Sequence, residues 1–232
     1  MNPGVHLLWP TPLGIFRMDD SQAFHADMLA LVHAQMASQC EQRGLVAPPA
    51  FFASDDNLAA LLRERAEGRR FLAFIADALQ TLVGQANQTA WSGQAVAPDL
   101  QMTGMWFQCS RDGAFHDVHT HANCSWSAAY IVQIDPEELR VRHPVYGVAN
   151  GVTRFYGPRF NQLAGAWVDL GNAYLLPPHV DVPPVPGQLV VFPAWLPHKA
   201  MPYAGTLDRV IISFNVGVRD RNGRNLLQPF GP

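Results

Sequence analysis

The sequence is poor in cysteine, modest in charge and free of long apolar runs. Its three cysteines, Cys40, Cys109 and Cys124, form no CxxC pair and are odd in number, so reduced thiols are expected instead of a disulfide framework. No stretch reaches the roughly 18 consecutive apolar residues of a transmembrane helix. The opening residues also lack the basic start and apolar centre of a signal peptide. We therefore expect a soluble protein of the cytoplasm with no membrane partner.

The charge balance gives no reason to expect nucleic acid as a partner. The formal net charge is −3 and no cluster of lysine or arginine stands out. Hydrophobic residues make up 48% of the 232 residues, which indicates a well-buried globular protein with room for one core. We predict a single domain over 1–232, with an N-terminal strand and supporting helices in 1–92 and a β core in 93–220. Whether the protein forms a homodimer is left open.

The hydrophobic periodicity predicts helices in the first part of the chain and strands in the second. Apolar residues recur at helical spacing in 22–42 and again in 58–83, where Gly68 either breaks the helix or joins two helices. Short strands are predicted at 5–18, 100–108, 114–121, 125–134, 151–157, 166–170, 188–195 and 209–218. This order is typical of a β sandwich or jelly roll with helices stacked on one sheet. The Pro-rich connections 136–150 and 171–187 are candidates for substrate-facing loops.

One short histidine-rich segment, HDVHTH, lies in a predicted strand. Because alternate residues of a strand point to the same face, Asp117, His119 and His121 are expected on one face and His116 on the other. Two imidazoles at this spacing can bind one metal ion, with metal–nitrogen distances of about 2.1 Å. An HxH pair alone is a weak indication, because it often arises by chance. The histidines that stand alone, and are set aside as ligands, are His6, His25, His33, His143 and His179.

A second pattern follows about 80 residues downstream, where an apolar strand leads into FPAW, then His198, then a strand that begins at Arg209. The residues that alternate onto one face of this last strand are Arg209, Ile211, Ser213 and Asn215. An arginine on the inward face of an apolar strand is unfavourable unless an anion pairs with it. That anion is either an internal carboxylate, Asp117 or Asp169, or the carboxylate of a ligand held by the planar guanidinium.

The order of these residues resembles that of 2-oxoglutarate-dependent oxygenases. It consists of two close histidines, a distant histidine and an arginine eleven residues after the distant one. The sequence is similar to a narrower family, the small bacterial and phage 2OG-Fe(II) oxygenases, from Leu7 to Asn215. The residues that carry the resemblance are Trp106, Gln108, Gly113, His119, His121, Ser127, Tyr130, Gly157-Pro158-Arg159, FPAWLPH from Phe192 to His198, Arg209 and Phe214-Asn215. The sequence departs from the superfamily at His121, which replaces the aspartate of HxD, and from the family at Ala128 and Ile131, which replace a glycine and a tyrosine.

The resemblance implies a double-stranded β-helix (a cupin-like jelly roll) preceded by the helical segment, and a dioxygenase that uses iron(II), 2-oxoglutarate and O₂. Iron would be held by His119, His121 and His198. The far carboxylate of 2-oxoglutarate would pair with Arg209. The residues that would support it with hydrogen bonds are Ser213, Tyr130 and Asn215. Asp117 is either an acceptor that orients a ligand imidazole or, as the alternative to His121, the third ligand.

The reaction that the resemblance implies is hydroxylation of an unactivated C–H bond in a small organic or amino-acid-like substrate, with release of succinate and CO₂. Three alternatives stay open: a cupin-like three-histidine dioxygenase without 2-oxoglutarate, a zinc or nickel hydrolase or isomerase, and a non-catalytic metal- or ligand-binding jelly roll. Halogenation is disfavoured, because halogenases of the superfamily have a small residue where His121 stands. Succinate release that depends on 2-oxoglutarate distinguishes the oxygenase from all three.

Overall fold

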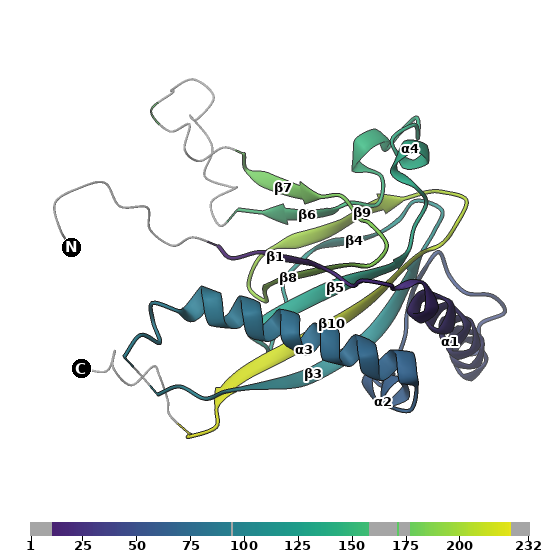
Figure 1. The fold of residues 1–232 in the computed structure, drawn as a ribbon. Helices are drawn as coiled ribbons and strands as arrows, with labels where there is room; N and C mark the ends of the chain where they lie inside the picture. The colour runs from purple at the N-terminus through teal and green to yellow at the C-terminus, as the bar shows by residue number, and fades with distance from the viewer. Residues whose placement is uncertain (1–10, 94, 158–170, 172–176, 224–232) are drawn as a thin grey trace.

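The computed structural model describes residues 11–93, 95–157, 171 and 177–223. Its strands form two antiparallel sheets (Figure 1). The six-stranded sheet has the order β1 (Gly14–Arg17), β8 (Gln188–Pro193), β5 (Trp126–Gln133), β10 (Arg209–Asp220), β3 (Pro98–Ser110) and β2 (Phe51–Ala53). The four-stranded sheet has the order β4 (Ala114–His119), β9 (His198–Tyr203), β6 (Thr153–Tyr156) and β7 (His179–Val182). The mainly β architecture of the double-stranded β-helix is thereby confirmed.

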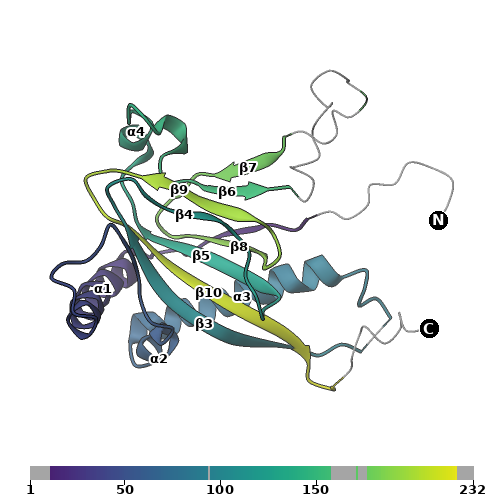
Figure 2. The same cartoon turned by 180° about the vertical axis from the view of Figure 1, so that it is seen from behind.

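Three helices cover the outer face of the six-stranded sheet: α1 (Gln22–Gln42), α2 (Leu58–Arg63) and α3 (Ala66–Asn87). Figure 2 shows the same sheet from behind, with these helices on its far side. The main core lies between the helices and the sheet, where the rings of Phe24 and Phe71 stack at 4.5 Å between centroids. None of the described helices is long and apolar enough to cross a bilayer. The helices therefore stabilise one face of the sheet and leave the other face to the functional site.

The predicted helix at 58–83 is divided, but not at Gly68. The chain leaves the helical path between Arg63 and Ala66, and Gly68 lies inside α3. A β-carbon built on Gly68 would stand 2.2 Å from the carbonyl oxygen of Leu62. Glycine is thus required for the close approach of α2 to α3, and it does not end the helix.

Most predicted strands are present, with shifted ends, and three strands were missed. The strand predicted at 166–170 lies outside the described residues. The missed strands are β2, β7 and β9. The most important is β9, because His198 is its first residue and was predicted to precede a turn. The single domain over 1–232 stays a prediction.

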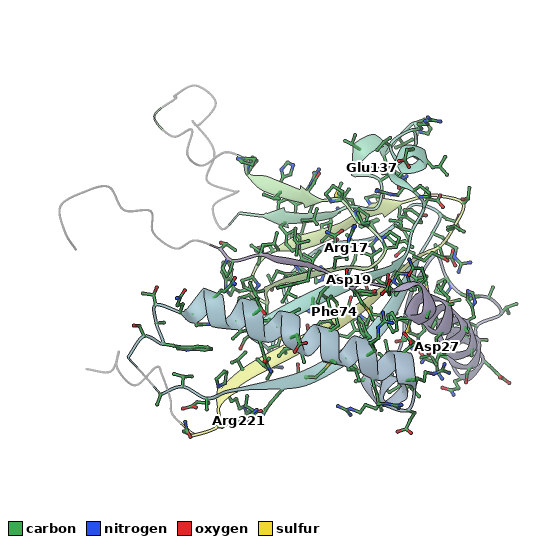
Figure 3. All side chains as sticks on the ribbon, viewed as in Figure 1. Arg17, Asp19, Asp27, Phe74, Glu137 and Arg221 are labelled. Carbon is green, nitrogen blue, oxygen red and sulfur yellow. The ribbon has the colours of Figure 1, made fainter. Side chains whose placement is uncertain are left out.

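The connection 136–150 is folded and lies far from the end of β10. It contains the short helix α4 (Glu137–Arg140), and the buried Arg140 donates hydrogen bonds to the carbonyl oxygens of Asp135 and Asn150. Figure 3 places Glu137 of α4 and Arg221, just beyond β10, at opposite ends of the molecule. No residue of 136–150 lines the two cavities described below. The expectation that this segment faces the substrate is therefore not supported.

Candidate metal centre and cosubstrate pocket

Three histidines from the predicted set lie together at one edge of the four-stranded sheet. His119 ends β4 and is directly opposite His198, the first residue of β9. His121 follows two residues after β4, where its backbone N–H donates a 2.9 Å hydrogen bond to the carbonyl oxygen of Ala194. One ring nitrogen from each histidine lies within 4.8 Å of those of the other two. Nε2 of His121 is 3.3 Å from Nε2 of His198.

Backbone carbonyls orient two of the three rings. Nδ1 of His119 is 2.7 Å from the carbonyl oxygen of Asp117, and Nδ1 of His198 is 3.0 Å from that of Leu196. Because a carbonyl oxygen only accepts, each Nδ1 carries the proton and each Nε2 presents a lone pair. His121 forms a side-chain hydrogen bond with Asn215. Two of the three imidazoles are thus held in the tautomer that binds a metal through Nε2.

Burial also keeps two of the three imidazoles, those of His121 and His198, neutral. Burial lowers the pKa of His198, which is 6% exposed, to about 3. Burial, followed by the charge of His119, lowers the pKa of His121 to about 4. A histidine must be neutral to bind a metal ion. Near neutral pH these two side chains are therefore ready to bind a cation.

The expectation that His116 faces away from His119 is wrong. The two rings stack at 3.9 Å between centroids, and both line the same cavity. Between His116 and His119, β4 advances three residues while β9 advances two, from Ala200 to His198. The extra residue is a β-bulge, which interrupts the alternation of side chains.

The alternation of side chains along a strand also predicts the wrong position for Asp117. Its side chain is 76% exposed, and its carboxylate accepts a 3.1 Å hydrogen bond from Nζ of Lys199. Asp117 is not part of the group of potential ligands. The prediction that its carboxylate lies at the metal site, as ligand or as acceptor for a ligand imidazole, is therefore corrected: only its backbone carbonyl reaches His119.

A cavity of about 260 Å³ separates the histidines from the six-stranded sheet. Its lining includes His116, His119, His121, His198, Trp106, Gln108, Arg209, Ile211 and Ser213. Arg209 is only 2% exposed, and its Nε has no hydrogen-bond partner among the described residues. Burial lowers the pKa of this guanidinium to about 10. A charged, buried and incompletely bonded arginine is unfavourable by itself, so the cavity favours an anion.

The three residues expected to assist Arg209 are in different places. Ser213 lines the cavity. Asn215 accepts a 2.8 Å hydrogen bond from Oγ of Ser127 and contacts His121, so it supports a candidate metal ligand. Tyr130 lies on the opposite face of the sheet, where its hydroxyl is 2.9 Å from Nε2 of His25. Its role as a cosubstrate ligand is therefore wrong.

The comparison with protein families identifies the family. Residues 104–215 match the family described as "Putative 2OG-Fe(II) oxygenase". All three histidines and Arg209 lie within this matched region. The matched region, 112 of the 232 residues, supports placing the chain among the 2OG-Fe(II) oxygenases.

Solved structures share the oxygenase fold at low sequence identity. A prolyl-4-hydroxylase from Pseudomonas putida is 16% identical, with a TM-score of 0.51, and the match covers 90% of this chain and 94% of that one. The epimerase SnoN from nogalamycin biosynthesis is 15% identical, with a TM-score of 0.56 and coverage of 90% and 78%. HygX from Streptomyces hygroscopicus, solved with nickel and 2-oxoglutarate bound, is 12% identical, with a TM-score of 0.52 and coverage of 89% and 82%. Among curated proteins, none matches significantly.

The residues of this oxygenase fit the iron and 2-oxoglutarate that its superfamily name implies. The grouped imidazole nitrogens suit iron(II), and the partly unbonded Arg209 suits a carboxylate. Trp106, Gln108 and His116 also line the cavity, although the sequence alone predicted no role for them. The strand register provides the missing signal, because Gln108 pairs with Ile211 and Trp106 with Ser213 on the inward face.

Proposed function

We propose that this 2OG-Fe(II) oxygenase hydroxylates an unactivated C–H bond of a small organic substrate. One oxygen atom of O₂ would enter the substrate as a hydroxyl group. The other would enter succinate, as 2-oxoglutarate loses its first carboxylate as CO₂. The observation that carries this proposal is that three histidines and a buried arginine line one cavity.

His119, His121 and His198 are the residues that would hold iron(II), as the grouping of their nitrogens supports. With 2-oxoglutarate bound, this iron supplies the activation of O₂. Three protein ligands would leave positions on the metal open for the keto acid and O₂. His121 in place of a carboxylate leaves the site one unit more positive, and a doubly charged anion such as 2-oxoglutarate compensates for that charge.

Arg209 would bind the far carboxylate of 2-oxoglutarate. Its guanidinium offers parallel N–H donors that match a carboxylate. Because Asp117 pairs with Lys199, it does not compete for Arg209. Asp169, the other carboxylate considered as a partner, lies outside the described residues. The hydroxyl of Ser213, on the same wall of the cavity, is placed to add a hydrogen bond.

Hydroxylation is the proposed outcome among those that the fold supports. Solved structures with this fold include an epimerase and a carbocyclase, so the fold alone does not select the reaction. Hydroxylation needs no additional group on the protein once a substrate C–H bond lies near the iron. A halogenase would need an open position for the halide, and His121 stands at that position.

The test compares Arg209→Leu with a matched control, Arg154→Gln. Arg154 forms an ion pair with Asp181 on the four-stranded sheet and does not line the cavity. Loss of one partner of a buried charged pair costs about 3–5 kcal/mol, or at least a hundredfold in affinity. We expect Arg209→Leu to raise the dissociation constant of 2-oxoglutarate by that factor and to keep its iron content. Arg154→Gln should keep both the wild-type dissociation constant and the wild-type iron content. The anaerobic absorption band of the iron–keto-acid complex measures the affinity.

Two results would contradict the proposal. An unchanged 2-oxoglutarate affinity in Arg209→Leu would exclude Arg209 as the carboxylate ligand. Consumption of O₂ by the wild-type enzyme without formation of succinate would instead support the three-histidine dioxygenase that uses no keto acid. The cytoplasmic location and the homodimer stay predictions.

A further inference from the structure

A second, larger hollow lies on the other side of His121. This groove has a volume of about 1050 Å³ and is formed where β5 begins and where α3, β8 and β10 end. Its lining includes three tryptophans, Trp91, Trp126 and Trp195, together with Arg219 and His121. His121 also lines the inner cavity. The groove and the cavity therefore meet at a candidate metal ligand.

The size of the inner cavity argues that the molecule to be oxidised binds in the groove. The inner cavity, of about 260 Å³, equals the volume of roughly nine water molecules at about 30 Å³ each. A metal ion, a five-carbon keto diacid and O₂ fill most of that space. A substrate of more than a few atoms must then extend outward past His121, and the groove is where it can do so.

Three of the six tryptophans of the chain line this groove. Trp126 is buried, Trp91 is half-buried and Trp195 is 53% exposed. The turn that carries Trp195 is fixed by backbone hydrogen bonds from Ala194 to Ser125 and from His121 to Ala194. A large ring that stays exposed on a fixed turn beside a metal site offers a ready surface for a flat apolar ligand.

The groove also holds one unpaired positive charge. Arg219 pairs through its backbone with Asp99 of β3, and its exposed side chain has no ion pair or hydrogen bond among the described residues. The acidic residue of the groove, Asp220, is already engaged, because its Oδ1 accepts hydrogen bonds from the backbone N–H groups of Ala97 and Asn222. Arg219 is therefore the side chain of the groove that can pair with a negatively charged group of a ligand.

We propose that the groove binds the substrate of the oxygenase, and that this substrate is a small organic acid with a flat apolar ring system. The ring would lie against Trp195, the acid group at Arg219, and the C–H bond to be oxidised would point past His121 into the inner cavity. This proposal rests on the proposed function, because it takes the inner cavity to be filled by iron and 2-oxoglutarate.

The experiment uses 1-naphthylacetate and its uncharged counterpart 1-naphthylacetamide as probes. Both are titrated calorimetrically, without oxygen, into the enzyme loaded with iron(II) and 2-oxoglutarate. We expect the acid to bind at one site per chain with a dissociation constant below about 1 mM, and the amide to bind about three to ten times more weakly. Trp195→Ala should weaken both probes about tenfold, because each loses its ring contact.

Arg219→Gln should weaken only the acid, to the affinity of the amide. Matched controls are Val148→Ala and Arg142→Gln, two exposed positions in the folded segment 136–150, and both should bind the acid as the wild type does. Equal binding of acid and amide, or an acid affinity unaffected by Trp195→Ala, would overturn the proposal. So would absence of binding while the iron–keto-acid band forms normally. Absence of that band would instead contradict the proposed function.

Discussion

At the scale of single residues, the site depends on imidazoles that stay neutral in the folded protein. Burial lowers the pKa of His198 to about 3 and that of His121 to about 4. The carbonyl oxygens of Leu196 and Asp117 hold the Nδ1 protons of His198 and His119. These contacts prepare the nitrogens for a cation before any cation arrives, which reduces the reorganisation that metal binding requires.

The same pKa shifts predict how the metal-free protein responds to acid. In the unfolded chain a histidine titrates near pH 6.5, so between that pH and about 4 the unfolded state binds more protons than the folded state. The free energy of unfolding should therefore fall as the pH falls through this window, by about 1.4 kcal/mol per pH unit for each such histidine. Burial lowers the pKa of His25 and His116 as well, and both add in the same direction.

Urea denaturation of the metal-free protein at pH 7.5 and pH 5 measures this effect. His198→Gln should make the free energy of unfolding depend less on pH, because the substitution removes a buried histidine with a strongly lowered pKa. The control is His33→Gln, at an exposed position of α1, which should keep the pH dependence of the wild type. Equal pH dependence in the wild type and in His198→Gln would show that His198 is protonated in the folded protein.

The identity of the third ligand is tested by His121→Ala and Asp117→Asn. Partners of metal ligands typically change metal affinity about 10–100-fold, so loss of a ligand itself should exceed that range. We expect His121→Ala to lose most of its iron. Asp117→Asn should retain iron, because the exposed carboxylate accepts its hydrogen bonds, among the described residues, from Lys199 and from the backbone N–H of Val118. Iron per chain after anaerobic reconstitution is the measurement, and the opposite pattern would restore an aspartate-containing site.

At the scale of elements, the positions of most strands along the chain could be predicted from the sequence, but their irregularities could not. The HxH pair, the distant His198 and Arg209 stand at spacings that strand geometry and family resemblance make informative. The bulge in β4 leaves no mark in HDVHTH, because the residues around it would suit a regular strand equally well. Its extra residue brings His116 toward the site and turns Asp117 outward. Alternation alone predicts the opposite, with Asp117 toward the site and His116 away from it.

Burial on both faces explains the error at Tyr130. In β5 nearly every residue is buried, so the pattern of hydrophobic residues does not distinguish the face toward the helices from the face toward the cavity. The register does, because Tyr130 pairs with Ile212, and both belong to the core beneath the helices. β9 was missed for the opposite reason: its sequence, HKAMPY, combines polar residues and a proline and lacks a strand-like apolar pattern.

The junction of α2 and α3 gives a prediction at the same scale. Gly68→Ala places a methyl group within 2.2 Å of the Leu62 carbonyl oxygen, and we expect it to destabilise the fold by about 1–3 kcal/mol. Gly84→Ala, in the same helix, meets no atom within 4 Å and should stabilise it by up to about 1 kcal/mol. Chemical denaturation of the two variants provides the comparison. If the free energy of unfolding changed in the same direction in both variants, helix propensity and not the contact with α2 would determine the effect of Gly68→Ala.

At the scale of the whole molecule, the site joins the two sheets. His119 and His198 belong to the four-stranded sheet, whereas Arg209 belongs to the six-stranded sheet on the other wall of the cavity. A cosubstrate that binds the metal at one end and Arg209 at the other would therefore connect the sheets. Such a ligand binds the folded chain alone, so it should raise the melting temperature in proportion to its affinity.

We expect the melting temperature to rise in two steps. Manganese(II), a substitute for iron that is stable in air, should raise it first, and 2-oxoglutarate should add a second rise only when the metal is present. At a hundred times its dissociation constant, each ligand adds about 2.7 kcal/mol, or roughly 5–10 °C for a chain of this size. Arg209→Leu should keep the first step and lose most of the second, because its carboxylate partner is gone while the histidines remain. Glutarate, which lacks the keto group, should give a much smaller second step in the wild type. A full rise with 2-oxoglutarate in the absence of metal would show that the keto acid binds elsewhere and does not connect the sheets.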